Sequence, residues 1–187
     1  MSSPDSKTNN EDTINLVKKF IASNQRKRRN LVNDIELSAE SLFAVGEEII
    51  NYVDREGDDW SIGWILQVLK KYKPNFFDND IYNNWFNTNS AIDLKYNDLQ
   101  LNLLNQNFEE ADRLTSAYLR KLAGKVAENR GYVFYSEVKD IPSEDLCSID
   151  RLWNIYSQGK FGFSNQAKLL KSVGKRYDLL WPKIGWK

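Results

Sequence analysis

A short basic and aromatic segment, GKVAENRGYVFY, holds the residues best suited to recognise a small molecule. Its two cations and three aromatic residues are Lys125, Arg130, Tyr132, Phe134 and Tyr135. Aromatic rings can cover the faces of a flat apolar ligand, while a lysine or an arginine can pair with its carboxylates. The same combination also suits a protein partner, so the segment by itself leaves both kinds of ligand open.

Residues that could carry out catalysis are scarce. The chain has no histidine and one cysteine, which excludes a serine-histidine-acid triad, a histidine-bearing zinc site and a histidine-ligated haem. We expect that cysteine, Cys147, to lie on the apolar face of a helix as a small buried residue rather than to act as a reactive thiol. The acidic pairs Glu109–Glu110 and Glu144–Asp145 stand at predicted helix starts, where the helix dipole favours a carboxylate. We therefore predict no enzymatic activity, no catalytic residue and no metal site.

Charge and hydropathy exclude further classes of partner. The 26 basic and 26 acidic residues balance, so no general attraction to nucleic acid is expected. We interpret the basic run QRKRRN as a solvated helix face or turn. No apolar stretch is long enough to cross a bilayer, which leaves peripheral association as the only membrane contact to consider. The polar residues 1–12 are predicted to form a disordered tail without a signal or transit sequence.

Helical periodicity dominates from Thr13 onward, so the predicted fold class is all-α. Residues 13–86 are predicted to form an N-terminal bundle of four helices, which begin near Thr13, Glu36, Ser61 and Ile81, the second of them running to about Arg55. The small polar segment NTNSAID, residues 87–93, is the predicted linker. Residues 94–187 then form a second all-helical domain.

The turn GKFGFSNQ lies between the last strongly periodic helices of this second domain. Gly159 is predicted to end one helix, Gly162 to permit a close backbone approach and Ser164 to cap the next helix. We expect Phe161 and Phe163 to pin the turn into the core. The predicted role of the turn is therefore structural.

Three segments, NQNFEEADRLT, YSEVKDIP and DLCSIDRLWNIYSQGKFGFSNQ, carry a resemblance to a known family, and the closing LWPKIGWK extends it. On these residues the stretch from about Leu94 to Lys187 resembles the porphyrin-binding core of the genomes-uncoupled family. Its members are accessory proteins of magnesium chelatase in chlorophyll synthesis. They continue past the IGW stretch with an aromatic and basic loop that closes a groove, whereas this sequence ends at Lys187.

The resemblance implies a non-enzymatic regulator that binds protoporphyrin IX or Mg-protoporphyrin IX non-covalently and stimulates magnesium chelatase, with the large porphyrin-handling subunit of that enzyme as partner. One wall of the family's groove follows the second core helix, where Arg130 and Tyr135 occupy matching positions. An arginine of several relatives is Ser116 here, which removes one partner for a ligand carboxylate. The implied porphyrin-binding residues are Phe108, Leu122, Lys125, Val126, Arg130, Tyr132, Phe134, Tyr135 and Trp186.

A second function stays open beside this one. It is a helical protein-interaction or sensor domain that keeps the fold without binding pigment, because a fold does not guarantee its usual site. We expect a monomer, located either in the plastid stroma as a plastid-encoded protein or in the cytoplasm of a cyanobacterium. Without histidine, a bound tetrapyrrole is expected to be held by its faces and carboxylates rather than by an axial nitrogen or thiolate.

Overall fold

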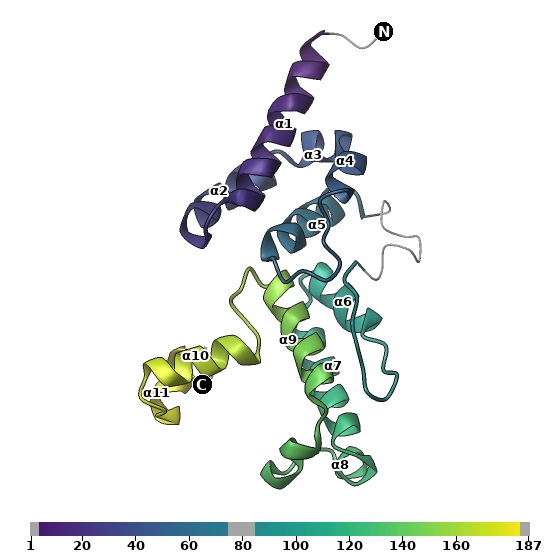
Figure 1. Cartoon of the computed structure of the whole chain (residues 1–187), viewed down its shortest axis with the longest axis vertical. Helices are drawn as coiled ribbons and strands as arrows, with labels where there is room; N and C mark the ends of the chain where they lie inside the picture. The colour runs from purple at the N-terminus through teal and green to yellow at the C-terminus, as the bar shows by residue number, and fades with distance from the viewer. Residues whose placement is uncertain (1–3, 75–84, 184–187) are drawn as a thin grey trace.

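The computed structural model describes residues 4–74 and 85–183, and every regular element in these two ranges is a helix (Figure 1). The all-α fold class predicted from the sequence is confirmed. The N-terminal half contains α1 (Pro4–Ala22), α2 (Gln25–Leu37), α3 (Ala39–Ala44), α4 (Gly46–Ile50) and α5 (Trp60–Tyr72). The C-terminal half contains α6 (Asn97–Leu104), α7 (Phe108–Leu122), α8 (Lys125–Arg130), the 3-10 helix η3 (Tyr135–Asp140), α9 (Ser143–Tyr156), α10 (Phe163–Ser172) and α11 (Tyr177–Lys183).

Several helix boundaries in the N-terminal half differ from the sequence expectation. α1 begins at Pro4, so residues 4–12 of the expected disordered tail are helical. The second predicted helix is divided among the end of α2, α3 and α4, because the backbone leaves helical geometry at Ser38 and Val45. The hydroxyl of Ser38 donates to the carbonyl of Asp34 at 2.8 Å, a local bond of the kind that competes with a regular helix. The fourth predicted helix lies largely outside the described residues.

One apolar core runs through both halves of the chain. α5 crosses α9 so closely at Gly63 that an added Cβ would lie 2.5 Å from the carbonyl oxygen of Ile155. The buried side-chain amide of Gln67 donates to the carbonyls of Leu103 and Tyr156, at 2.9 and 2.8 Å, and so ties α5 to the ends of α6 and α9. The N-terminal bundle and the C-terminal core are therefore packed on each other rather than joined only by a linker.

The predicted linker, residues 87–93, is itself fixed to α9. The backbone N–H of Ala91 donates to the carboxylate of Asp145 at 2.9 Å, and that of Asn89 donates to the hydroxyl of Ser148 at 3.0 Å. The hydroxyl of Tyr96 donates to the other oxygen of Asp145 at 2.5 Å. Burial, and after it the hydrogen bond to Asp145, raises the pKa of Tyr96. Asp145, which is fully buried, thus serves as an acceptor that holds this segment in place.

The basic run QRKRRN begins α2, and one of its arginines is buried. Arg28 is 7% exposed, and its guanidinium donates to both carboxylate oxygens of Asp59, at 2.6 and 3.0 Å. It also donates to the carbonyls of Phe20 and Ile21 in the last turn of α1. The prediction of a solvated face is therefore wrong for Arg28, although the other residues of the run are exposed.

Figure 1 shows how these packed helices present the C-terminal half. α7 and α9 run together away from α5 and α6, α8 lies at their far end, and α10 and α11 stand to one side of α9. Within the described ranges, no helix combines the length and the apolar character needed to cross a membrane.

Candidate functional site

Two cavities adjoin along α7 and α9, since the ring of Phe163 lines both of them. The first, the apolar cavity, has a volume of about 410 Å³, and its surface comes mainly from Leu119, Val133, Val138, Ile141, Leu146 and Phe163. The second, the aromatic cavity, has a volume of about 430 Å³, and its larger side chains are Phe108, Trp153, Phe161, Phe163, Gln166 and Leu169. Each volume is typical of a small-molecule site, and the pair is named the groove below.

Three rings form one wall of the aromatic cavity, and we name Phe108, Trp153 and Phe161 the aromatic wall. Phe108 stacks on Trp153 with 6.1 Å between ring centroids and 24° between ring planes. Phe161 meets both rings edge-on, at 5.7 Å from Phe108 and 6.0 Å from Trp153. The indole N–H of Trp153 donates to the hydroxyl of Thr115, which in turn donates to the carbonyl of Ala111. The wall is therefore fixed before any ligand arrives.

The turn GKFGFSNQ supplies part of this wall rather than only joining two helices. Phe161 is 45% exposed, so the expectation that it lies in the core is wrong. Gly162, not Ser164, precedes α10 as its N-cap, with a φ of 116°. A Cβ at Gly162 would lie 2.5 Å from a carboxylate oxygen of Asp150, which accepts the N–H of Ser164. Only glycine fits this backbone, and the tight reversal turns Phe161 toward the aromatic wall.

A second arrangement, the arginine clasp, holds the segment between α8 and η3. The guanidinium of Arg130 donates to the carboxylate of Glu137 at 2.5 Å and to the carbonyl of Tyr132 at 3.0 Å. The same group lies over the rings of Phe134 and Tyr132, with centroid distances of 4.0 and 4.7 Å. Glu137 also accepts the N–H of Phe134, and the hydrogen bond from Arg130, followed by this one, lowers the pKa of Glu137.

The arginine clasp shapes the apolar cavity from one side. Val133 lies in the chain between the two ring residues of the clasp, and Val138 follows Glu137. Both valine side chains line the apolar cavity. The clasp therefore determines where this part of the cavity wall stands.

The residues that the sequence predicts as porphyrin-binding lie in different places. Phe108 belongs to the aromatic wall, Leu122 is buried in the core, and Arg130 is held in the arginine clasp. Five residues are exposed and line neither cavity, namely Lys125, Val126, Tyr132, Phe134 and Tyr135. Trp186 lies outside the described residues.

Most residues of the groove were not singled out from the sequence as binding residues. Trp153, Phe161 and Phe163 lie in the longest of the family-like segments, which was the available signal, but the two phenylalanines were interpreted as residues that pin a turn into the core. The expectation for Cys147 is wrong, because its thiol is exposed and the residue lines the apolar cavity. On α9 it shares a face with Asp150, three positions later, rather than with the buried Ile149.

Charged groups in the groove are few and do not resemble a metal site. In the part of the chain that the structure describes, no three histidine, cysteine, aspartate or glutamate side chains are grouped so that they could hold a metal ion. The arrangement is suited to holding a flat, mainly apolar molecule by its faces.

Comparison with known proteins matches this half of the chain to one family. The model of the GUN4-like family matches residues 89–187. A Ycf53-like protein of Synechocystis is 37% identical over 131 residues, which are 68% of this chain and 56% of that protein. The chloroplastic tetrapyrrole-binding protein of Arabidopsis thaliana is 46% identical over 88 residues, which are 47% of this chain and 33% of that protein.

A solved structure gives the same family assignment. The structure of GUN4 from Chlamydomonas reinhardtii superposes with a TM-score of 0.53 at 36% identity, over 54% of this chain and 72% of that one. The present chain spans only about a third to just over a half of the length of the two relatives above.

Proposed function

This chain belongs to the GUN4-like family, and on that basis we propose that its groove binds a tetrapyrrole. The observation that carries the proposal is the aromatic wall, three rings already fixed against one another beside an apolar cavity. A tetrapyrrole has wide flat faces that aromatic rings can cover and an edge of small apolar substituents that an apolar cavity can take. The name of the Arabidopsis relative, a tetrapyrrole-binding protein, supports the same ligand class.

The ligand is protoporphyrin IX or Mg-protoporphyrin IX, bound non-covalently. No histidine is present to ligate a metal centre, so binding depends on the ring faces and the carboxylates. A porphyrin is larger than either cavity and therefore extends beyond them. We place Tyr132 and Phe134 at the rim, because they flank Val133 in the chain and are exposed. The remaining proposed contacts outside the cavities are Lys125, Val126, Tyr135 and Trp186.

The proposed role of the bound pigment is regulatory rather than catalytic. As a family member, the protein is proposed to stimulate magnesium chelatase in chlorophyll biosynthesis by exchanging tetrapyrrole with the large subunit of that enzyme. We propose that it acts as a monomer in the plastid stroma or in the cytoplasm of a cyanobacterium, since relatives are a chloroplastic and a cyanobacterial protein. A chelatase assay with purified subunits tests this role, and it predicts faster magnesium insertion when the protein is added at the concentration of the porphyrin.

A titration with protoporphyrin IX tests the binding function itself. Tryptophan fluorescence should fall along a saturable curve, because Trp153 lies in the aromatic wall within energy-transfer reach of a bound porphyrin. The variant Trp153→Phe keeps a ring in the wall and should bind with similar affinity but with less quenching. Folded protein that shows no saturable binding would instead favour the protein-interaction or sensor domain.

A further inference from the structure

Charged residues are divided unequally between the two cavities of the groove. The aromatic cavity is lined by two lysines, Lys160 and Lys183, and by one carboxylate, Asp112. Among the described residues, the apolar cavity is lined by no lysine or arginine and by one carboxylate, Asp150, which already accepts the Ser164 N–H. The two lysines outnumber the one carboxylate in the aromatic cavity, which therefore carries a net positive charge. The apolar cavity carries the single negative charge of Asp150.

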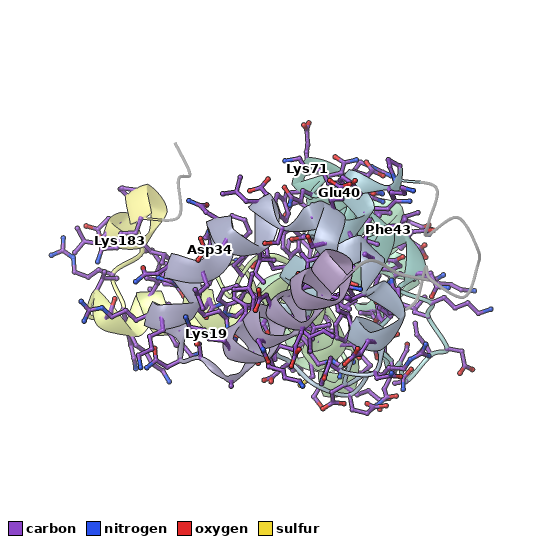
Figure 2. All side chains as sticks on the ribbon, turned by 90° about the horizontal axis from the view of Figure 1, so that it is seen from above. Lys19, Asp34, Glu40, Phe43, Lys71 and Lys183 are labelled. Carbon is purple, nitrogen blue, oxygen red and sulfur yellow. The ribbon has the colours of Figure 1, made fainter. Side chains whose placement is uncertain are left out.

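The two lysines come from different elements and line the same cavity. Lys160 lies in the turn that builds the aromatic wall, and Lys183 ends α11. Figure 2 shows the Lys183 side chain on the yellow C-terminal segment, which stands to one side of the purple N-terminal helices. Both lysines are exposed, and within the described residues neither ammonium group makes an ion pair or a hydrogen bond. They are therefore available to an anionic ligand.

Arg130, the cation that the family resemblance favoured, is not available to an anionic ligand in the same way. Its guanidinium is engaged by the carboxylate of Glu137, by a carbonyl and by two aromatic faces. Its Nε atom is buried and has no hydrogen-bond partner among the described residues, so a ligand cannot reach it without opening the clasp. To pair with a ligand carboxylate, the guanidinium of Arg130 would have to give up several of these contacts. The ammonium group of Lys160 would give up none.

From this division we infer the orientation of the ligand in the groove. The carboxylate edge of the tetrapyrrole lies in the aromatic cavity against Lys160 and Lys183, and the apolar edge enters the apolar cavity. Arg130 is a positioning residue, which holds the wall formed by Val133 and Val138 and does not touch the carboxylates. An unpaired carboxylate is strongly disfavoured in an apolar cavity, and an ammonium group strengthens its hydrogen bonds in the aromatic cavity. This inference rests on the proposed function.

The orientation is tested with two ligands that share an apolar frame, protoporphyrin IX and its dimethyl ester, titrated in the same detergent. Lys160→Met removes the charge and keeps the stem, so it should weaken binding of the diacid by about tenfold and leave binding of the ester unchanged. Adding Lys183→Met should weaken diacid binding further. Lys168→Met is the matched control, because Lys168 is an exposed lysine of α10 that lines neither cavity, and it should change neither affinity.

Arg130 gives the complementary result. Arg130→Met should weaken the diacid and the ester by the same factor, because a displaced wall affects both ligands alike. Arg130→Lys keeps the charge but loses the planar guanidinium, so it should also weaken both ligands if the role is positioning. Circular dichroism and urea unfolding verify that each variant is folded.

Each remaining outcome contradicts a specific statement. If Arg130→Met weakens only the diacid while Lys160→Met has no effect, the carboxylates face the loop and the orientation is reversed. If wild-type protein binds both ligands but no variant distinguishes them, the carboxylates point into solvent and the orientation is wrong. If wild-type protein binds neither ligand, the proposed function itself fails.

Discussion

The indole N–H of Trp153 donates to the hydroxyl of Thr115 across 2.9 Å, and this bond joins α9 to α7 at the aromatic cavity. Both residues are buried, with exposures of 8% and 5%. Because the Trp153 ring carries the stack with Phe108 and the edge contact with Phe161, the bond sets the tilt of the whole aromatic wall.

Replacing Thr115 with valine should lower both stability and affinity. The isosteric side chain leaves the indole N–H of Trp153 buried without an acceptor, which should cost about 1–3 kcal/mol of the free energy of unfolding. Urea unfolding measures this loss. Thr115→Ser keeps the hydroxyl and should retain most of the stability, so an equal loss in the two variants would show that the hydrogen bond is not the cause.

The contact between the two halves is tested by a pair of glycine variants. Gly63→Ala places a methyl group 2.5 Å from the carbonyl oxygen of Ile155, where backbone atoms cannot easily move, and should destabilise the fold by about 1–3 kcal/mol. Gly46→Ala, in α4, meets no atom within 4 Å and should be neutral or slightly stabilising. Thermal unfolding compares the two. A tolerated Gly63→Ala would contradict the close crossing of α5 and α9.

Arg28 should contribute more to stability than its neighbours in the basic run. Arg28→Met removes the bonds to Asp59 and to two carbonyls at the end of α1, and should cost about 1.5–3 kcal/mol, the usual range for hydrogen bonds to charged groups. Arg29→Met, at an exposed position, should change the free energy of unfolding by less than about 0.5 kcal/mol. Equal effects of the two variants would mean that Arg28 is solvated.

The arginine clasp should weaken in acid. The native pKa of Glu137 lies below its usual value of 4.5, so the stability that its charge contributes is complete above that value and is lost as the pH falls through the native pKa. Hydrogen exchange of the Phe134 amide, which donates to Glu137, should therefore lose protection as the pH falls below 4.5 and through the lowered native pKa. In Glu137→Gln the protection should be lower and free of this pH dependence. An unchanged pH profile in that variant would exclude Glu137 as its origin.

The metal centre of the pigment should matter little to affinity. Since the chain has no histidine, protoporphyrin IX and Mg-protoporphyrin IX should bind with dissociation constants within about tenfold of each other. Cys147 lines the apolar cavity, so Cys147→Ala, which leaves no side-chain ligand, is the control for thiol ligation. A large preference for the magnesium form that disappears in this variant would show that axial ligation, rather than the ring faces, governs binding.

The parts of the fold that follow from local periodicity could be predicted from the sequence. The acidic pairs Glu109–Glu110 and Glu144–Asp145 lie in the first turns of α7 and α9, as expected. The break at Ser38 was not expected, because neither glycine nor proline marks it. The break at Val45 was not expected either, although Gly46 follows it directly. The burial of Arg28 depends on Asp59, which lies 31 residues away and is brought close only by tertiary packing.

The candidate site was predictable only in part for the same reason. Family resemblance pointed to Phe108, which lies in the aromatic wall, and to Arg130, which the clasp holds away from the cavities. Lys160 reaches the groove because a reversal at Gly162 brings the turn beside α7, an arrangement that no local pattern reveals. Whether Cys147 is buried or exposed depends on which face of α9 points to the core. The sequence pattern was assigned to the wrong face at this position, and the prediction for Cys147 was therefore reversed.

The central claim, that the groove between α7, α9 and α10 holds the pigment, is tested most directly by the dissociation constant of protoporphyrin IX for two aromatic variants. Phe161→Ala removes one ring of the aromatic wall and should weaken binding by about tenfold. Tyr135→Ala removes a ring that is 96% exposed and lines neither cavity, and should weaken binding by less than about twofold. If Tyr135→Ala abolishes binding while Phe161→Ala binds like the wild type, the pigment lies on the exposed loop and not in the groove.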